Sequence, residues 1–182
     1  MTLAARLAPR PDALFVIVMP AFDAAATIAE AISSVLSQTF AGWEIVVVDD
    51  GSTDGTGALA EDFAVRDDRV RVIHQANGGA GAARDAGIVA SVAPYIVRLD
   101  ADDVMLPRCL ETYASFIAEH PDYDIYSCDG DVFGVGEWQG RYYAAESFGG
   151  TERFDGVTAF TLDEMLESNL ILSPGAVCTR EA

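Results

Sequence analysis

Tyr95-Ile-Val-Arg-Leu-Asp-Ala-Asp-Asp-Val104 is the stretch on which the fold and the chemistry of this chain depend. Residues 95–99 are short, apolar and β-prone, which predicts a buried strand. Asp100, Asp102 and Asp103 follow at once. Three carboxylates so close together repel one another unless a cation lies among them, and open α/β sheets bind ligands at the carboxyl ends of their strands. A divalent metal site is therefore predicted here; an acidic turn that caps the next segment is the plainer alternative.

Three more apolar segments precede this stretch, and each is followed by a helical pattern. We expect strands over 14–19, 43–48 and 70–74, with helices over 27–38, around residues 59–63 and over 77–92. Thr27 and Glu30 fit a capping box at the start of the first helix. Buried strands that alternate with helices predict an α/β fold with a parallel sheet.

The pattern is weaker after residue 107. A helix that ends at His120, a strand over 124–128, a hairpin formed by 132–135 and 141–145, and a short helix around 162–166 are expected. Residues 179–182 resemble the start of a helix. The predicted organisation is a loose tail over 1–12 and one domain over 13–182 that we expect to continue beyond the last residue.

Composition restricts the function more than the fold. The 182 residues are 51% apolar and 22% charged, which is typical of a globular domain, and no apolar run is long enough to span a bilayer. A net charge of −18 argues against nucleic acid as a partner. All 11 basic residues are arginines, and the lack of lysine excludes P-loop and Schiff-base chemistry. Three separated cysteines in apolar surroundings indicate a reducing, cytoplasmic location.

A second acidic pair, Asp49 and Asp50, ends the predicted strand 43–48. We expect it to face the same crevice as the first acidic cluster, from a neighbouring strand tip. These carboxylates could bind a nucleobase or ribose, or Asp50 and Asp54 could cap the following helix. The glycine-rich segment 77–84 predicts a helix N-terminus with Arg84, suited to phosphate oxygens; pairing of Arg84 with one of the acids is equally compatible with the residues.

Five motifs in order resemble the family 2 inverting glycosyltransferases with the GT-A fold, a Rossmann-like three-layer sandwich with a mostly parallel central sheet. Together they cover about the first 110 residues and are more specific than any one of them alone. They are Val16-Ile-Val-Met-Pro-Ala-Phe-Asp23, Ala31-Ile-Ser-Ser-Val-Leu-Ser-Gln-Thr-Phe40, Val46-Val-Val-Asp-Asp-Gly-Ser-Thr-Asp54, Arg84-Asp-Ala-Gly-Ile88 and Leu99-Asp-Ala-Asp-Asp103.

The resemblance implies metal-assisted transfer of a sugar from a nucleoside-diphosphate sugar, with a UDP-sugar favoured, to a saccharide, lipid or protein acceptor. Mg²⁺ or Mn²⁺ would bridge carboxylates and diphosphate. The implied metal ligands are Asp102 and Asp103. The implied binding residues for the donor are Pro20, Ala21, Phe22, Asp49, Asp50, Arg84, Asp100, Ala101 and Asp102.

Inversion also requires a general base, which in the family follows a glycine-rich acceptor segment after the acidic motif. Residues 172–176 could begin that segment, but no later acidic residue matches, so the base is not identified. Asp129, Asp131, Asp163 and Glu164 lie in other contexts. Two alternatives remain: a module that binds a nucleotide sugar without turnover, and a phospho-receiver-like regulatory domain, which the lack of lysine disfavours. Peripheral attachment to the inner face of a membrane is also left open.

Overall fold

The chain forms two compact units in the computed structural model, Met1–Tyr126 with Pro174–Ala182, and Ser127–Ser173. The structure describes residues 9–122, 124–126 and 177–180, and only the backbone of four short strands between 131 and 159. In the second unit, β6 (Asp131–Val132) pairs antiparallel with β7 (Gly140–Arg141), and β8 (Glu152–Phe154) pairs with β9 (Val157–Ala159). An antiparallel hairpin is thus present, but of the predicted strands 132–135 and 141–145 only Val132 and Arg141 lie in β6 and β7.

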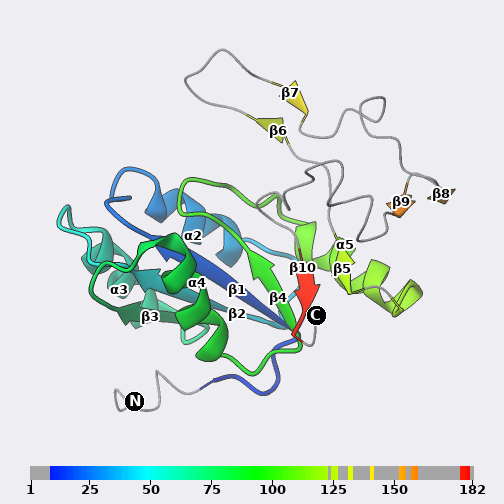
Figure 1. Cartoon of the computed structure of the whole chain (residues 1–182), viewed down its shortest axis with the longest axis horizontal. Coiled ribbons are helices and arrows are strands. Elements are labelled where there is room, and N and C mark those ends of the chain that lie inside the picture. Colours follow the sequence, from blue (N-terminus) through cyan, green and yellow to red (C-terminus); the bar gives the residue numbers. More distant parts are fainter. Residues whose placement is uncertain are drawn as a thin grey trace. The chain divides into compact units, whose positions relative to one another are not determined.

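A six-stranded sheet forms the centre of the first unit, in the order β3-β2-β1-β4-β10-β5 (Figure 1). β10 alone runs in the direction opposite to the other five strands, so the prediction of a mostly parallel sheet is confirmed. The strands are β1 (Phe15–Ala21), β2 (Trp43–Asp49), β3 (Val70–His74), β4 (Tyr95–Arg98), β5 (Ile125–Tyr126) and β10 (Val177–Thr179).

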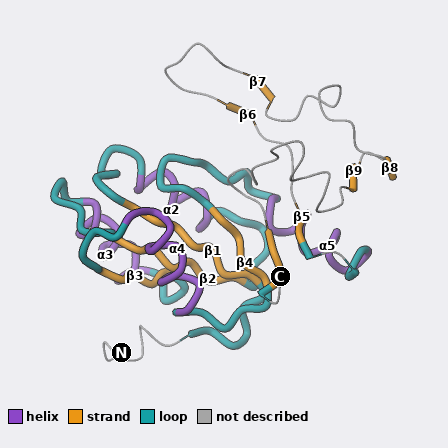
Figure 2. The backbone as a smooth tube through the Cα atoms, viewed as in Figure 1, coloured by secondary structure: helices purple, strands orange, loops and turns teal. Residues whose placement is uncertain are grey.

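Four helices follow the first four strands in turn: α2 (Ile28–Leu36), α3 (Thr56–Arg66), α4 (Gly79–Val89) and α5 (Cys109–Glu119) (Figure 2). Apolar residues of α2, α3 and α5 share one buried cluster with one face of the sheet, and α4 contributes to a separate cluster on the other face. This arrangement confirms the three-layer sandwich. None of these four helices, the ones in the described part of the first unit, is long and apolar enough to cross a bilayer.

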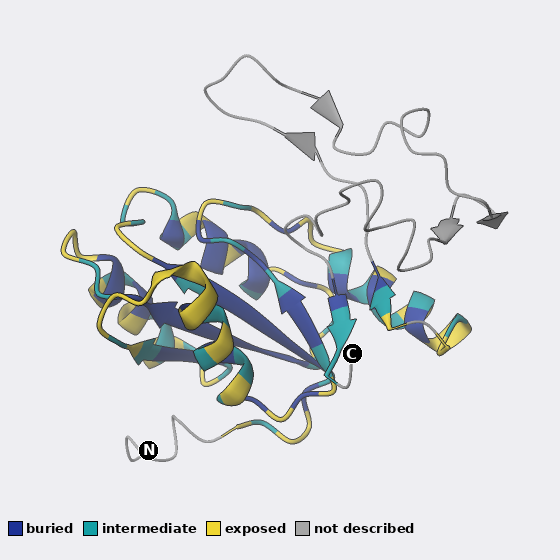
Figure 3. Cartoon of the chain, in the orientation of Figure 1, coloured by how far each residue is buried: buried dark blue, intermediate teal, exposed yellow. Residues whose placement is uncertain are grey.

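Strands β1 and β2 are buried along nearly their whole length because helices cover both faces of the sheet (Figure 3). Helix α4 approaches them so closely that a Cβ atom on Gly87 would lie 2.5 Å from Val18 Cγ1 and 3.3 Å from Val48 Cγ2. Only a residue without a side chain fits there. The glycine in the motif at 84–88 therefore serves packing rather than ligand binding.

A polar cluster lies within the α4 face of the sheet. Glu44 of β2 is fully buried, accepts a hydrogen bond from Arg71 Nη1 at 2.9 Å and accepts another from the Ser91 hydroxyl. Arg71 is also buried, on neighbouring β3. A sequence reading that treats 43–48 as a purely apolar strand misses this pair, since the partner of Glu44 is far along the chain.

Three expectations differ from the structure or lie outside it. Thr27 occupies the N-cap position of α2 without a side-chain capping bond; its hydroxyl instead donates to the Ala24 carbonyl at 3.4 Å, so the capping box is wrong. Thr179 is paired with Tyr95 in β10, so no helix begins at Thr179. The short helix predicted around 162–166 lies outside the described residues.

The strand order also removes one alternative. In receiver domains and other flavodoxin-like folds the sheet runs 2-1-3-4-5, with the first strand between the second and third. Here β1 lies between β2 and β4, and β3 is at the edge. The phospho-receiver interpretation is therefore wrong.

Candidate functional site

The predicted acidic residues lie at one edge of the sheet, where β1, β2 and β4 end. Asp49 is the last residue of β2 and pairs in register with Ala21 of β1, while the amide of Leu99, next after β4, donates to the Val18 carbonyl. The two acidic sets are not on neighbouring strands as expected, because β1 lies between β2 and β4. This order places the end of β1, with Phe22, between the two acidic sets.

The end of β1 presents an exposed aromatic ring. Pro20 is half-buried and Ala21 is buried, but Phe22 is 53% exposed. A large apolar side chain at the ligand-binding edge of a parallel sheet is available for stacking against a planar ring. Of the three residues predicted to line a base pocket, Phe22 is the one that offers an exposed ring, whereas Ala21 is buried.

Asp50 is buried, and its carboxylate binds the start of α4 rather than the start of α3, the helix that follows Asp50 in the chain. Its Oδ1 accepts from Gln75 Nε2 at 2.7 Å and from Gly78 N at 2.9 Å, and its Oδ2 accepts from Gly79 N at 2.7 Å. The amide of Gly78 is the first cause that lowers the pKa of Asp50, so the carboxylate stays ionised. It has about four acceptor positions, of which three are used, which leaves capacity for a further N–H donor.

This contact corrects the expectation of phosphate binding at the start of α4. The amides of Gly78 and Gly79 already donate to Asp50, so they are not open donors. Capping by Asp54 is confirmed: its Oδ1 accepts from the amide of Thr56, the first residue of α3, at 3.0 Å, and the Thr56 hydroxyl is the first cause that lowers the pKa of Asp54. Its Oδ2 also accepts from Ala25 N at 2.9 Å.

The loops after β1 and β2 are joined by further hydrogen bonds. Asp23 N donates to the Ser52 hydroxyl at 3.1 Å, Asp23 Oδ1 accepts from Thr53 N at 2.8 Å, and Ala24 N donates to the Thr56 hydroxyl at 2.7 Å. The polar run after Asp50 thus fixes the segment that carries Phe22. Sequence analysis identified this run as a loop but not as the partner of the β1 loop.

Asp49 supports the same loop and binds a histidine that sequence analysis did not select. Asp49 Oδ1 accepts from Ser52 N at 3.1 Å, and Oδ2 lies 2.9 Å from His74 Nδ1. His74 Nε2 lies 3.1 Å from Glu61 Oε1. Burial would raise the pKa of Asp49, but the bonds from Ser52 and His74 outweigh it and lower the pKa. Asp49 thus stays charged and anchors β2, the loop and β3 together.

We expect His74 to titrate above its ordinary pKa of 6.5, first because of its hydrogen bond to Asp49, which together with Glu61 outweighs partial burial. A raised pKa means that its contribution to stability is present below 6.5 and is lost as the pH rises through the folded-state value. His74 is 52% exposed, so after solvent screening the contribution is at most about 1 kcal/mol. NMR titration of the ring measures this. Asp49→Asn should lower the pKa more than Glu61→Gln, and titration at or below 6.5 in the unmodified protein would contradict the assignment.

Gly57, the second residue of α3, packs directly on the hydrogen-bonded side chains of Asp49 and His74. A Cβ there would lie 2.4 Å from Asp49 Oδ2 and 2.8 Å from His74 Cε1. We expect Gly57→Ala to displace the His74 ring, lower its pKa and destabilise the fold by about 1–3 kcal/mol. Gly81→Ala is the matched control, because Gly81 is also in the first turns of a helix and has open space around it. It should stabilise by about 0.4–1 kcal/mol. Chemical denaturation of both variants measures the difference, and equal effects would refute the packing argument.

The acidic cluster after β4 contains unsatisfied polar groups. Asp100 is bound by Arg84 Nη2 of α4 at 2.8 Å, as the paired alternative for Arg84 predicted, whereas Asp102 is exposed. Among the described residues, Asp103 Oδ2 and Arg84 Nε are buried without a hydrogen-bond partner. Burial, then the charges of Asp102 and Asp100, raise the pKa of Asp103 to about 6. The cluster thus contains one buried acceptor, Asp103 Oδ2, and one buried donor, Arg84 Nε, that have no hydrogen-bond partner.

These groups fit a metal–diphosphate better than a metal alone. No set of three or more metal-binding side chains converges in the part of the chain that the structure describes. Mg²⁺ and related ions commonly use one or two carboxylates, with substrate phosphates and water as the remaining ligands. Asp103 offers an unused oxygen to such a cation and Arg84 an unused N–H to a phosphate. Ala101 is buried and separates Asp100 from Asp102.

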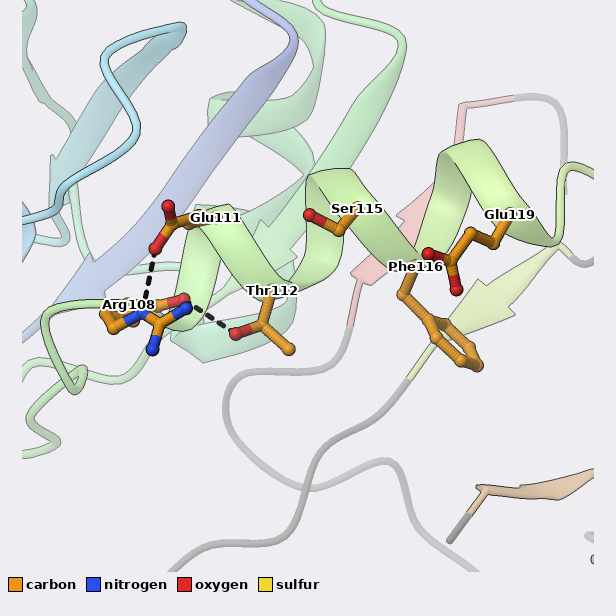
Figure 4. Close-up of a pocket in the computed structure, with 6 residues that line it drawn as sticks. All are labelled: Arg108, Glu111, Thr112, Ser115, Phe116 and Glu119. Carbon is orange, nitrogen blue, oxygen red and sulfur yellow. Dashed lines mark hydrogen bonds and ion pairs between the residues drawn. The ribbon is translucent and has the colours of Figure 1, made fainter. Parts of the chain in front are cut away.

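A hollow in the surface lies elsewhere, along one side of α5 (Figure 4). Arg108 and Glu111 form an ion pair of 2.9 Å within it, and the Thr112 hydroxyl donates to the Arg108 carbonyl. None of the residues predicted for the site contributes to it. None of its lining residues holds one of the buried unpartnered polar atoms found in the described residues, so we do not assign it to the donor. Its lining residues are Arg108, Glu111, Thr112, Ser115, Phe116 and Glu119.

The fold is a three-layer α/β sandwich with acidic residues at the carboxyl edge of its sheet, and comparison with known proteins identifies the family. The model of Glycosyl transferase family 2 matches residues 16–166, and the chain belongs to that family. Glycosyltransferase GlyG of Streptococcus pneumoniae is 35% identical over 131 residues, which cover 71% of this chain and 42% of GlyG. The uncharacterized glycosyltransferase EpsJ of Bacillus subtilis is 42% identical over 112 residues, 62% of this chain and 32% of EpsJ.

A solved structure, that of TarS, has a similar fold. The structure of S. aureus TarS 1-349 in complex with UDP-GlcNAc has a TM-score of 0.71 and 25% sequence identity, and the match covers 91% of this chain and 45% of that chain. The chain thus spans less than half the length of the curated relatives and of this structural neighbour. The prediction of a family 2 glycosyltransferase with a GT-A fold is confirmed.

Proposed function

We propose that this domain binds a nucleoside-diphosphate sugar, a UDP-sugar in the first place, and transfers the sugar with inversion and with help from Mn²⁺ or Mg²⁺. The acceptor is a hydroxyl group of a saccharide, lipid or protein. One observation carries the proposal: the unused acceptor of Asp103 and the unused donor of Arg84 occur in the acidic cluster at the carboxyl edge. The UDP-GlcNAc complex of TarS supports the choice of nucleotide.

Each proposed contact uses an exposed side chain or a polar atom of the site that has hydrogen-bonding capacity left. The base would stack on Phe22, which is exposed, and its N–H would reach the remaining acceptor position of Asp50. Asp49 would hold the loop that carries Asp50 through its bond to Ser52 N. Arg84, already held by Asp100, would direct its free Nε–H toward the diphosphate. The donor is thus bound across the ends of β1, β2 and β4.

The charge of the protein makes a cation necessary for this arrangement. The chain carries a net charge of −18, and the acidic edge would repel a diphosphate in the absence of a positive ion. When bound by Asp102 and Asp103, Mn²⁺ or Mg²⁺ would stabilise the departing nucleoside diphosphate as a Lewis acid. We do not assign the general base that inversion requires; Asp129, Asp163 and Glu164 lie outside the described part, and only the backbone of Asp131 is described.

Thermal stability in the presence of nucleotides tests this proposal. UDP, GDP and dTDP are each added with Mn²⁺, with Mg²⁺ and with a chelator. We expect UDP with metal to raise the melting temperature, because a ligand at 100 times its Kd stabilises the folded state by about 2.7 kcal/mol. No metal-dependent shift with any nucleotide would overturn the proposal. A shift without sugar transfer to any acceptor would favour the non-catalytic binding module.

A further inference from the structure

Two polar side chains in and just after α2, Ser34 and Gln38, are buried although neither is among the residues proposed to contact the donor. Ser34 is 7% exposed and Gln38, two residues after the end of the helix, is 8% exposed. Buried polar side chains cost free energy unless they are hydrogen-bonded. Both of them direct their hydrogen bonds to the segment that follows the acidic cluster, residues 105–110.

Gln38 joins the two ends of that segment. Its Nε2 donates to the Leu106 carbonyl at 2.8 Å, and its Oε1 accepts from the amide of Leu110 at 3.0 Å. Leu110 is the second residue of α5, whose own N-cap residue, Arg108, makes no side-chain capping bond. The first turn of α5 therefore receives its cap from Gln38.

Ser34 holds the chain two residues after the end of the acidic cluster, at Met105. Its hydroxyl accepts from the amide of Met105 at 3.0 Å and donates to the Ala31 carbonyl at 2.6 Å. Next to Gln38, Thr39 N donates to the Pro107 carbonyl at 2.9 Å. The chain is thus held at Leu99, where its amide binds β1, and again at Met105. Only the acidic residues and their immediate neighbours lie between these two points.

The carboxylates between Leu99 and Met105 repel one another. Asp100, Asp102 and Asp103 are three carboxylates within four residues, and like charges so close together repel one another, so the loop would spread apart if its far end were not held. A cation site requires the opposite, since ligands must be held close together before the ion arrives. The hydrogen bonds of Ser34 and Gln38 supply that restraint, although neither side chain is proposed as a ligand of the cation.

We propose that Ser34 and Gln38 are positioning residues for the cation and diphosphate, which they support by holding the acidic loop from behind. The inference rests on the proposed function, because it concerns the same site. It assigns a role to the segment 31–40, which resembled the family but received no function from the sequence. Partners that orient metal ligands in this way commonly change metal affinity by about 10–100-fold when they are removed.

The test compares Ser34→Ala and Gln38→Met with two controls. Ser33→Ala is matched to Ser34→Ala, because Ser33 is adjacent but exposed and bonds only within its own helix. Glu44→Gln controls for a general loss of stability, since Glu44 is buried on the other face of the sheet, in the pair with Arg71. All are studied well below their melting temperatures. If Gln38→Met does not fold, Ser34→Ala carries the test alone.

Two measurements are made. In the metal-free protein, amide hydrogen exchange should accelerate at Met105 in Ser34→Ala and at Leu110 in Gln38→Met, and at neither in the controls. Titration with Mn²⁺ at saturating UDP, followed by electron paramagnetic resonance, should show an apparent Kd raised about tenfold or more in both variants and unchanged in both controls.

The outcomes separate this inference from the proposed function. If the unmodified protein binds Mn²⁺ with UDP and the two variants bind it equally well, the positioning role is refuted and the proposed function stands. If both controls lose affinity as much as the variants, the effect is one of stability and the inference is also refuted. If the unmodified protein does not bind Mn²⁺ with UDP at all, both proposals fail.

Discussion

Asp103→Asn is expected to remove the metal-dependent part of UDP binding and, at the same time, to make the free protein more stable. The pKa of Asp103 is raised to about 6 by burial and by the charges of Asp102 and Asp100. Its ionised form is therefore disfavoured by folding. Loss of this carboxylate relieves that penalty but also removes the oxygen that is free to bind a cation. Loss of a residue that only supports a metal ligand commonly lowers metal affinity by about 10–100-fold. Asp103 is proposed as a ligand itself, so we expect Mn²⁺ affinity to fall by more than about tenfold.

The pH dependence of this gain has a defined sign. Between the ordinary value of 3.8 and about 6, the folded protein binds more protons at Asp103 than the unfolded chain, so stability falls as the pH rises. The gain from Asp103→Asn should therefore be full above about pH 6, shrink toward pH 4 and vanish below it. Asp103 is partly exposed, so after discounting for screening we expect about 1 kcal/mol, or about 2–4 °C in melting temperature.

Thermal melts at pH 8 and pH 4.5 measure the gain, and Mn²⁺ titration with UDP measures the loss. Asp62→Asn, on the exposed side of α3, is the control and should alter neither quantity. Equal stability of Asp103→Asn and the unmodified protein at pH 8, with unchanged Mn²⁺ affinity, would remove Asp103 from the site.

Glu44→Ala is expected to cause the largest loss of stability among the single changes considered. Glu44 is fully buried, and its removal leaves the Arg71 guanidinium, with 3% of its side chain exposed, without its carboxylate. Breaking a buried ion pair by removing one partner costs about 3–5 kcal/mol. The Ser91 hydroxyl also loses its acceptor. Urea unfolding measures the change.

Glu111→Ala is the matched control, because Glu111 forms an ion pair of similar length with Arg108 at an exposed position. Exposed pairs contribute only about 0–1 kcal/mol. The double variant Glu44→Leu, Arg71→Met should be more stable than Glu44→Ala, since it leaves no buried charge. A loss in Glu44→Ala no larger than in Glu111→Ala would contradict this account of the cluster.

The local pattern of the sequence was sufficient for the first four strands. Strand β3 was predicted at its observed bounds, and β1, β2 and β4 to within one or two residues, because each is a short apolar run ended by proline or polar residues. The order of these strands could not be predicted, since periodicity contains no information on neighbours. That is why the insertion of β1 between the acidic strand tips and the return of β10 into the sheet were missed.

For the site, too, local sequence predicted the positions of residues but not their partners. The carboxyl edge and its acidic residues followed from the strand ends, but their partners are distant in sequence. Asp50 binds amides 28 and 29 residues further on, and Gln38 caps a helix 72 residues away. Sequence analysis gave no role to His74, the last residue of the predicted strand 70–74, because only the structure shows that it pairs in register with Asp49. Hydrogen bonds of this kind depend on the tertiary fold, which composition and spacing do not encode locally.

The central claim is that one cation joins the acidic cluster to a nucleoside diphosphate at the edge formed by β1, β2 and β4. A crystal of the protein grown with UDP and Mn²⁺, with anomalous diffraction recorded at the manganese absorption edge, tests it most directly. We predict a single manganese peak bonded to Asp102 or Asp103 and to a diphosphate oxygen, with the uracil ring against Phe22 and hydrogen-bonded to Asp50. Manganese elsewhere, or UDP bound away from this edge, would contradict the claim.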